Sequence, residues 1–590
     1  MTVSIITENT KILRSAYSTS QIHPSLTLIP VGQQMSSLFT TTAVLQLVQS
    51  KRLKMEDLVS DFFKFNCSDS RHTVFKMPPF CQSEVTILHL LTHTAGLEHR
   101  SFQPGEHTFG EQFPRIVHPP GKIYSYSPHG LALLGKIVSM VTGMPFDKYV
   151  EEKIFLPLGM LNTGFIAPNS DSKLLKKFNQ STTSTSSAKP HQHLFTPHSI
   201  KSDTFSKSET FEATKFDIND NFGWFSTVSD MNLFMEASLN KGAAGNSDSH
   251  LYGSVPKRIL EEPFADLMQT PHKSHTKSLS ICLGYYETVI KNTPILFKTS
   301  EATGSSHIMA ILPDEYIGFY AATNSNNPKY LWEVLEEFIL TYVDGRAEEK
   351  KRTIDATDEL KFDLEDSEFL GTYRLTSTSY TNYESFFSLF SQAQVYKSGE
   401  SLGIDLPFSG SFYIKKTTGN GSFLMDDGTQ LTFKRYAGQV RYVFTEDSEH
   451  NPVTFERVDY DSASVFLISA VSIFVIIYEI FQGDRDMDAS FLKFLIFFNC
   501  VSQSLFIALG LPLMWLTHGE RFFNLLPILK KVFILPVISQ FLTLAGSIAL
   551  LFFGRLEKKS VWHFLVLICC FRLCLYEIQF DLTFFDLPLH

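Results

Sequence analysis

A serine followed three residues later by a lysine is the spacing in this chain that is best suited to catalytic chemistry. On a helix the two side chains share one face, so the amine can take the hydroxyl proton and activate the oxygen for acyl transfer. Such pairs include Ser170/Lys173, Ser186/Lys189 and Ser274/Lys277. Two of them flank or lie within a Ser/Thr-rich stretch, residues 179–199, that is typical of a surface loop. None precedes a helix of apolar periodicity, so we interpret all three as chance matches.

The cysteines and the charge balance exclude two classes of function. The seven Cys residues show neither a CxxC pair nor a Cys/His spacing suited to zinc, and we predict no metal and no cofactor. Cys67 and Cys81 either close a short loop in an oxidising compartment or are free thiols. The net charge is −10 and no long basic block occurs, so nucleic acid is not expected as a partner.

The elements that must position a site fall into several units, because 590 residues exceed one ordinary domain. We predict a first domain over residues 1–345, a charged linker over 346–366 and a β-rich domain over 367–460. The last of these rests on short segments rich in β-forming residues, such as GSFYIKK and QLTFKRY, separated by Gly, Asp and Asn turns.

The remaining part, residues 461–580, is predicted to form three to four transmembrane helices. Uncharged apolar stretches at 462–478, 494–517 and 532–554 approach or reach the length that a bilayer core of roughly 30 Å requires. A fourth, from Val561, contains Arg572, whose charge is costly at mid-depth. We therefore predict a multi-pass membrane protein whose partner is the lipid bilayer. The alternative is that these stretches form buried core helices. Basic residues in the predicted loops favour neither orientation.

Several motifs in the first 345 residues follow one another in a familiar order. A helical segment at 40–48 is followed by LLTHTAGL at 90–97, PGKIYSYSP at 120–128, PLGM at 157–160, NFGWFSTVSD at 221–230 and ILPD at 311–314. In this order and spacing the chain resembles the β-lactamase-related serine hydrolases, which include class C β-lactamases and penicillin-binding proteins. The resemblance implies an α/β (α+β) fold, β-lactamase/transpeptidase-like, in which the N-terminal and closing strands form an antiparallel sheet beside a helical subdomain. Val3 begins at the first strand of that fold, without the usual leading helix.

The same resemblance places three catalytic motifs, all of which depart from the family pattern. In the first, S-x-x-K, the serine position holds Gln34 and the lysine position holds Ser37. In the second, Y-x-N, Tyr126 is kept and Pro128 replaces the asparagine. The third, K/H-T-G, is represented by Lys298, Thr299 and Ser300, where a side chain replaces the glycine that lets substrate approach the strand. A Gln amide is not an acyl nucleophile, and a Ser hydroxyl is not an amine base.

Three hypotheses follow. The first is a membrane-anchored pseudoenzyme whose cleft binds a peptide, a small molecule or a partner without acyl transfer. The second is a hydrolase of peptides, esters or amides with a rearranged nucleophile, Ser36 or Ser37, assisted by Tyr126 and Lys298. The third is a structural membrane module in which the first domain is a folding relic. His93, within LLTHTAGL, is expected to form hydrogen bonds within the fold rather than to act as a base.

Overall fold

The structure is a computed structural model. It describes residues 2–7, 13–16, 29–63, 85–99, 116–165, 198–201, 204–207, 224–245, 257–290, 293–302, 305–323, 329–343, 366–380, 388, 391–399, 401–407, 409–417, 421–436, 438–447 and 450–458. The predicted spans, the predicted linker except Asp366, and both Cys67 and Cys81 lie outside these ranges. Within the described ranges no helix combines the length and the hydrophobicity needed to cross a membrane.

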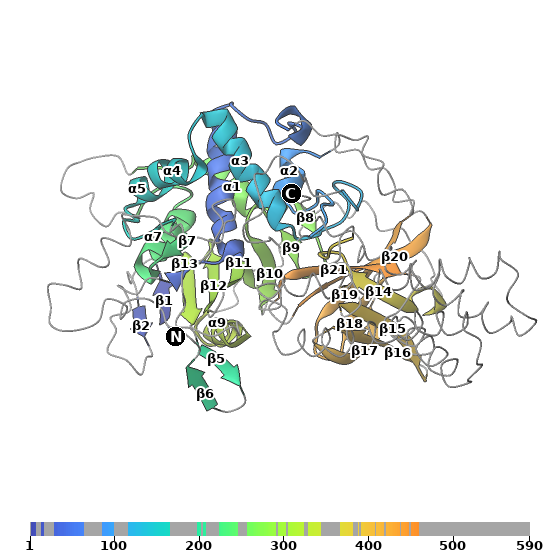
Figure 1. Ribbon diagram of the computed structural model, residues 1–590. Coiled ribbons are helices and arrows are strands. Elements are labelled where there is room, and N and C mark those ends of the chain that lie inside the picture. Colours follow the sequence, from blue (N-terminus) through green and yellow to red (C-terminus); the bar gives the residue numbers. More distant parts are fainter. Residues whose placement is uncertain are drawn as a thin grey trace, which may run out of the picture.

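An antiparallel sheet of eight strands forms the centre of the first domain (Figure 1). N-terminal strand β1 pairs with closing strand β13, Val3 lying opposite Ala321, as the resemblance implied. In spatial order the strands are β2 (Leu13–Ala16), β1 (Thr2–Ile6), β13 (Ile317–Thr323), β12 (Ser305–Leu312), β11 (Thr293–Ala302), β10 (Tyr286–Ile290), β9 (Ser280–Ile281) and β8 (Lys273–Ser274).

Helices and short elements surround this sheet. The helices are α1 (Gln33–Gln49), α2 (Ile87–Leu91), α3 (Pro128–Thr142), α4 (Phe146–Val150), α5 (Leu156–Leu158), α7 (Val228–Leu239), α8 (Glu262–Gln269) and α9 (Lys329–Tyr342). The short helical turns are Val59–Asp61, Glu151–Phe155 and Asp366–Glu368. Two small sheets are formed by β3 (Ile29–Pro30), β7 (Trp224–Ser226) and β4 (Gly164–Phe165), and by β5 (His198–Lys201) and β6 (Thr204–Lys207).

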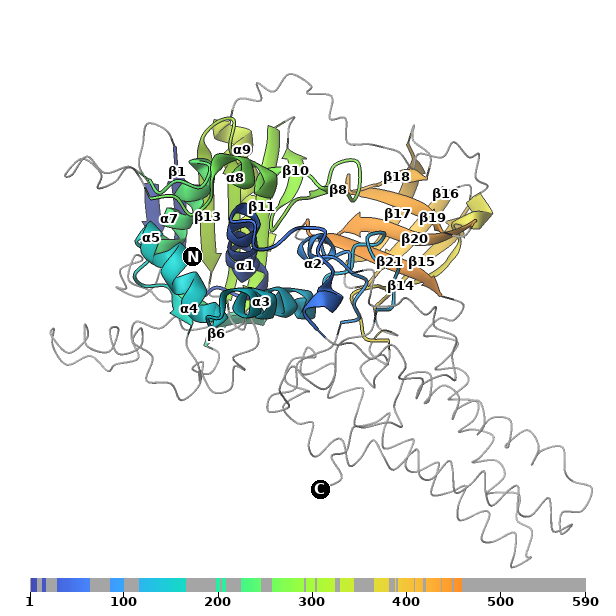
Figure 2. The same ribbon diagram turned by 90° about the horizontal axis from the view of Figure 1, so that it is seen from above.

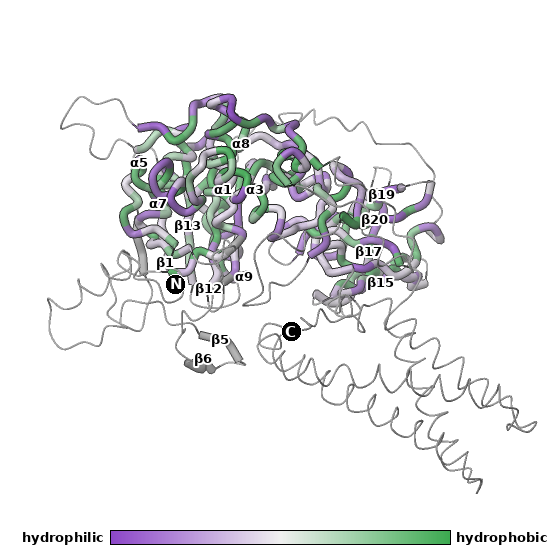
Figure 3. Tube along the Cα trace, turned by 45° about the horizontal axis from the view of Figure 1, so that its top comes forward, coloured by the Kyte–Doolittle hydropathy of each residue, from purple (hydrophilic) through white to green (hydrophobic). Residues whose placement is uncertain are grey.

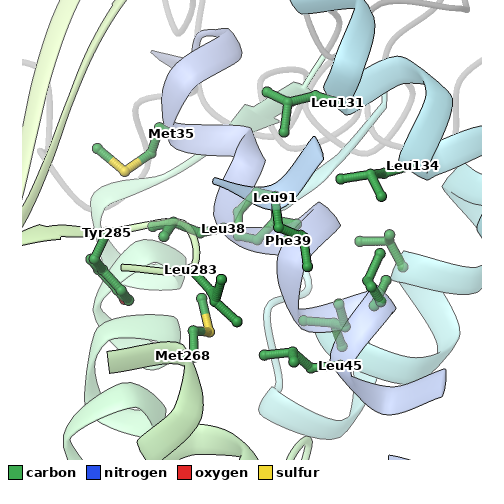
Figure 4. Close-up of a cluster of buried hydrophobic side chains, with 14 of the residues drawn as sticks. Met35, Leu38, Phe39, Leu45, Leu91, Leu131, Leu134, Met268, Leu283 and Tyr285 are labelled. Atoms are coloured by element: carbon green, nitrogen blue, oxygen red, sulfur yellow. The ribbon is translucent and has the colours of Figure 1, made fainter. Parts of the chain in front are cut away.

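Helix α1 is the central helix of the first domain. Its apolar side chains are buried on more than one face, which is typical of a helix enclosed by other elements rather than of a surface helix. Figure 4 shows Met35, Leu38 and Phe39 of α1 in one cluster with side chains of α2, α3 and α8 and of the segment before β10. The helix ends at Ser50, whose backbone N–H donates to the Gln46 carbonyl. This burial holds the start of α1 against the sheet.

The two faces of the sheet carry different helices. Met309 and Tyr320 belong to the core that contains α1, α3 and α7. Phe297 and Ile308 belong to the other core, which contains α9 and where the rings of Phe297 and Trp332 lie 4.9 Å apart. Strand β12 therefore presents alternate side chains, Ile308 and Met309, to two separate cores, as a strand buried on both faces must.

A closed barrel of eight antiparallel strands lies beside the β8–β10 edge of the sheet in both views (Figures 1 and 2). Its strands are β14 (Gly371–Leu375), β15 (Gln392–Ser398), β16 (Ser401–Leu406), β17 (Gly410–Lys416), β18 (Ser422–Met425), β19 (Gln430–Tyr436), β20 (Gln439–Glu446) and β21 (Pro452–Val458). The barrel closes because β14 pairs with both β15 and β21.

Side chains fill the interior of the barrel. The rings of Phe369, Phe423 and Phe433 lie 4.8 to 5.3 Å apart from one another. Hydrophilic and hydrophobic residues alternate along the barrel strands (Figure 3), because successive side chains of a strand point to opposite faces. The sequence indicated a β-rich unit here, and the structure adds that its strands close on themselves.

Candidate functional site

The start of α1 is where the first motif should place its nucleophile. Gln34 is half-buried there, and the Ser37 hydroxyl donates to the Gln34 backbone carbonyl at 2.6 Å. Ser36 is also buried, and its backbone N–H donates to the Gly32 carbonyl. The Ser37 hydroxyl proton is thus committed to the helix backbone. This turn therefore has no amine beside a hydroxyl nucleophile, because position 37 holds a serine instead of a lysine.

Tyr126 and Pro128 of the second motif lie where the chain enters α3. Pro128 is the first residue of that helix, a position that suits proline because its missing N–H would have no helical partner. The Tyr126 ring packs against the His93 ring at 4.6 Å between centroids. The Tyr126 hydroxyl is buried without a hydrogen-bond partner among the described residues, and burial raises the pKa of Tyr126 well above its ordinary value.

His93 is held by its backbone rather than by its ring. Its N–H donates to the Leu90 carbonyl, and its own carbonyl accepts from the N–H of Ser125. Within the described structure the ring Nδ1 has no hydrogen-bond partner, so the backbone of His93 makes the hydrogen bonds just named. Burial, followed by the charge of Lys298, lowers the pKa of His93 to about 3. The imidazole is therefore neutral at pH 7.

Lys298, on β11, is almost completely buried among aromatic side chains. Its Nζ lies 4.0 Å from the centroid of the Tyr286 ring. The hydroxyls of Tyr286 and Tyr124 are joined by a hydrogen bond of 2.8 Å. No described carboxylate pairs with Lys298, and burial lowers the pKa of this amine to about 7. An amine that is partly neutral at pH 7 is suited to accept a proton.

The other two residues of the third motif have different surroundings. The Thr299 hydroxyl donates to Oδ1 of Asn451, in the hairpin between β20 and β21 of the barrel, at 2.6 Å. The Ser300 hydroxyl is buried without a hydrogen-bond partner in the described structure. A Cβ on Gly32 would collide with this hydroxyl and with the backbone of Glu301, so the start of α1 and β11 are in close contact. The Thr299 hydroxyl is thus hydrogen-bonded to the barrel, whereas the Ser300 hydroxyl could bond to a ligand.

The structure therefore brings the three motifs to one region but assembles no serine–amine pair from them. Of the chance Ser-x-x-Lys pairs, Ser274 begins no helix; it lies in β8 and its hydroxyl donates to the Thr276 carbonyl. The other two pairs lie outside the described residues. Among the described side chains no group of His, Cys, Asp and Glu is arranged to hold a metal ion.

Residues to which the sequence gave no role also surround the third motif: Asn451 of the barrel, Tyr286 of β10 and Tyr124 of the segment before α3. Tyr286 lies beside the motif because β10 pairs with β11, whereas Tyr124 and Asn451 are more than 100 residues away in sequence. Only the position of Asn451 depends on how the barrel docks against the sheet.

The barrel is tied to the first domain by a buried polar network around Glu456. Arg441 donates to Glu456 Oε1 through two nitrogens, at 2.9 and 2.8 Å. The Tyr380 hydroxyl donates to Glu456 Oε2 at 3.3 Å and lies 3.0 Å from Nε2 of His118, in the first domain. A second tie joins His275 to the carbonyls of Thr445 and Val453 at 2.8 and 3.0 Å. These contacts hold the Asn451 hairpin against β11.

A protein-family model described as "Beta-lactamase" matches residues 35–340, which is more than half of the chain. The match begins one residue after Gln34 and includes the rest of α1, Tyr126, Lys298 and strands β8 to β13 of the central sheet. The chain belongs to the β-lactamase family. The match covers most of the first domain and leaves the barrel outside it.

Individual relatives are distant. The chain is 28% identical over 146 residues to the Bacillus subtilis protein named "Putative penicillin-binding protein PbpX", covering 24% of this chain and 33% of that one. It is 24% identical over 272 residues to a Salmonella schwarzengrund protein named "Putative D-alanyl-D-alanine carboxypeptidase", covering 41% of this chain and 60% of that one. The chain thus spans about a third and three-fifths of the length of these relatives.

Among solved structures, the crystal structure of SurE is similar over 78% of this chain and 94% of that one. The TM-score is 0.51 and the sequence identity is 16%. At this identity the likeness concerns the fold alone.

Proposed function

We propose that this protein is a membrane-anchored member of the β-lactamase family whose cleft binds a ligand without acyl transfer. The observation that carries the proposal is the start of α1, where Gln34 stands at the nucleophile position and the Ser37 hydroxyl bonds to the Gln34 carbonyl. Acyl transfer in this family pattern needs a hydroxyl nucleophile and a base within hydrogen-bond reach. Gln34 and Ser37 provide neither the nucleophile nor the amine.

The remaining groups support binding. The Tyr126 and Ser300 hydroxyls and Nδ1 of His93 are buried without partners in the described structure. Unpaired buried polar groups cost free energy, so native proteins usually satisfy them with water or a ligand. Lys298 adds a cation whose positive form would be favoured by an anionic group. The expected ligand is therefore a peptide or a small molecule that carries hydrogen-bond acceptors.

Membrane anchoring rests on the sequence. The apolar stretches between residues 462 and 576 are long enough to span a bilayer, and they follow the last barrel strand directly. Extraction of membranes at alkaline pH tests this part, because integral chains stay with the lipid and peripheral ones are released. Release of the full chain would contradict anchoring.

A hydrolase with a rearranged nucleophile is the second candidate, and the low pKa of Lys298 is the observation that favours it. In this mechanism Lys298 or Tyr126 would take the proton of Ser36 or Ser37, and the serine oxygen would attack the substrate carbonyl. Against it, Ser36 and Ser37 are both buried and Ser37 is already hydrogen-bonded.

One experiment separates the two candidates. The full chain in detergent is exposed to a fluorophosphonate and to a penicillin, and its intact mass is measured. Binding without acyl transfer predicts no adduct on the native chain, and an adduct on the double variant Gln34→Ser with Ser37→Lys. An adduct on the native chain would overturn the proposal, and loss of that adduct in Ser36→Ala or Ser37→Ala would name the nucleophile.

Ligand binding itself is tested by melting temperature across a library of peptides and small acids, since a ligand that binds only the folded state raises it. A rise that disappears in Lys298→Met supports binding in this cleft. No rise with any compound would favour the third reading, a structural membrane module.

A further inference from the structure

The two ends of the barrel carry opposite charge. Because the strands form an up-and-down barrel, β15, β17, β19 and β21 all end at the same rim, where β14, β16, β18 and β20 begin. We name this the basic rim and the opposite end the acidic rim. The names follow from the side chains that the strand directions bring to each end.

The basic rim gathers seven cationic side chains from five strands within the described residues. They are Lys397 of β15, Lys415 and Lys416 of β17, Lys434 and Arg435 of β19, Arg441 of β20 and Arg457 of β21. The described carboxylates at this end are Glu368 and Glu456. They pair with Arg435 and Arg441, respectively.

Three lysines of the basic rim remain available to another molecule. Lys397, Lys415 and Lys416 are exposed, and none forms an ion pair with a carboxylate in the described part of the chain. Lys415 and Lys416 are consecutive at the end of β17. Their charges therefore face solvent and are not neutralised by described carboxylates of the barrel.

The acidic rim has the opposite composition. Its described carboxylates are Asp405, Asp426, Asp427, Glu446 and Asp447. Arg374 of β14 lies opposite Glu456 of β21 and does not belong to this end. Its β20–β21 hairpin contacts the first domain, through Asn451 on Thr299 and through the His450 ring, 4.3 Å from Trp332. This rim therefore has a partner within the chain.

The chain leaves the barrel from the basic rim. Strand β21 ends there at Val458, and the first predicted span begins at Ser462, four residues later. Four residues reach at most about 14 Å. Anchoring as proposed above would hold the end of β21 within that distance of a lipid surface. Charges act over about 8 Å at physiological salt, which is of the same order.

We propose that the basic rim of the barrel binds the anionic headgroups of the membrane that anchors the chain, so that the barrel rests on the lipid surface instead of moving freely above it. Juxtamembrane lysines and arginines are attracted to phosphatidylserine-type surfaces, and the attraction accumulates over several side chains. The chain as a whole is acidic, with a net charge of −10, so the basic rim differs in sign from the chain average. The inference rests on the proposed anchoring.

The test uses the full chain in lipid nanodiscs, one set of phosphatidylcholine alone and one with about a third phosphatidylserine. A soluble amine-reactive reagent labels lysines, and mass spectrometry gives the rate at each position. We expect Lys397, Lys415 and Lys416 to react at least about threefold more slowly on the anionic discs, and salt to abolish the difference. Lys54, Lys136 and Lys257, exposed in the first domain, are internal controls whose rates should not change.

A charge-reversed variant tests cooperation within the rim. In Lys415→Glu with Lys416→Glu, Lys397 should lose its protection on anionic discs. The matched variant Lys136→Glu with Lys257→Glu changes the net charge equally and should leave that protection intact. Equal labelling of the rim on both kinds of disc would overturn the proposal, as would protection that survives reversal of Lys415 and Lys416.

The two proposals fail separately. A chain that resists alkaline extraction but shows no lipid-dependent labelling is anchored without rim contact. A chain that is released by alkali, yet whose rim is protected by added anionic vesicles and not by phosphatidylcholine vesicles, binds headgroups without being anchored. Protection by a nucleic acid and not by anionic vesicles would also overturn the lipid assignment.

Discussion

The Thr299 hydroxyl on β11 donates a hydrogen bond of 2.6 Å to Oδ1 of Asn451 in the barrel. Both side chains are buried. The amide nitrogen of Asn451 donates to Asp447 Oδ2 in turn, so the hairpin is itself held in shape. A residue of the third motif is thus occupied by the chain's own second domain.

Removal of this contact should loosen the barrel from the sheet. Asn451→Ala leaves the Thr299 hydroxyl unpaired, which costs about 1–2 kcal/mol, and lowers the melting temperature. Thr299→Val removes both the donor and its need for a partner. In a double-mutant cycle the two changes should therefore cost less together than the sum of the single changes. Strict additivity would show that the two residues do not interact in solution.

The buried amine of Lys298 should make stability depend on pH. Burial lowers its folded pKa from 10.5 to about 7, so between these values the unfolded chain binds more protons than the folded chain. Folding therefore becomes more favourable as the pH rises from about 7 toward 10.5, and the full penalty for burying the charge is present below pH 7.

Lys298→Met removes that penalty. We expect the variant to gain on the order of 3 kcal/mol over the native chain at pH 6, and the gain to shrink toward pH 10, as measured by melting temperature against pH. Lys257→Met, at an exposed lysine, is the control and should show no such trend. A gain that stays constant from pH 6 to 10 would contradict a lowered pKa at Lys298.

Gly32, before α1, should not tolerate a side chain. Its φ of 75° is in the left-handed region, and a Cβ there would collide with the Ser300 hydroxyl and the Glu301 backbone. Gly159 has a similar φ of 77°, but a Cβ there meets nothing within 4 Å. Gly159→Ala is expected to cost about 1 kcal/mol from backbone strain alone, and Gly32→Ala at least about twice as much. Similar melting temperatures for the two variants would argue against close contact between α1 and β11.

Glu456 should be the polar group on which barrel docking depends most. Burial opposes its ionisation, but attraction to His118, when that ring is protonated, and to the Arg374 and Arg441 cations outweighs burial and holds the pKa of Glu456 below its ordinary value. Glu456→Gln is expected to cost about 1–2 kcal/mol, because the buried Glu456 carboxylate loses its charge-assisted hydrogen bonds to Arg441, whose own side chain is 46% exposed.

The sign of the pH effect follows from the lowered pKa. Glu456 contributes its stability above the ordinary carboxylate pKa and loses it as the pH falls through the folded value. The native chain should therefore lose melting temperature on acidification more steeply than Glu456→Gln. Glu262→Gln, at an exposed ion pair with Lys241, is the control and should change neither quantity. If acidification lowers the melting temperature of the native chain no more steeply than that of Glu456→Gln, the Glu456 carboxylate does not contribute to the docking contact.

The local sequence was sufficient for the family, whereas the motif positions stay a prediction. Helix α1 and the replacements at Gln34, Ser37 and Pro128 are matters of residue type and spacing over a few turns, which a pattern carries directly. The β-rich character of the second domain was likewise visible, because alternation with a period of two is a property of each strand alone.

The tertiary structure decided what surrounds those positions. Closure of the barrel depends on pairing β14 with β21, about eighty residues apart, and no local pattern contains that register. The aromatic enclosure of Lys298, the masking of Thr299 by Asn451 and the separation of charge between the two rims all depend on the same long-range pairings. The sequence alone determined which residue types stand at the predicted motif positions Gln34, Ser37 and Pro128. Only the packing of two domains against each other decided which of the remaining groups are occupied, because burial and hydrogen-bond partners are set by segments distant in the chain.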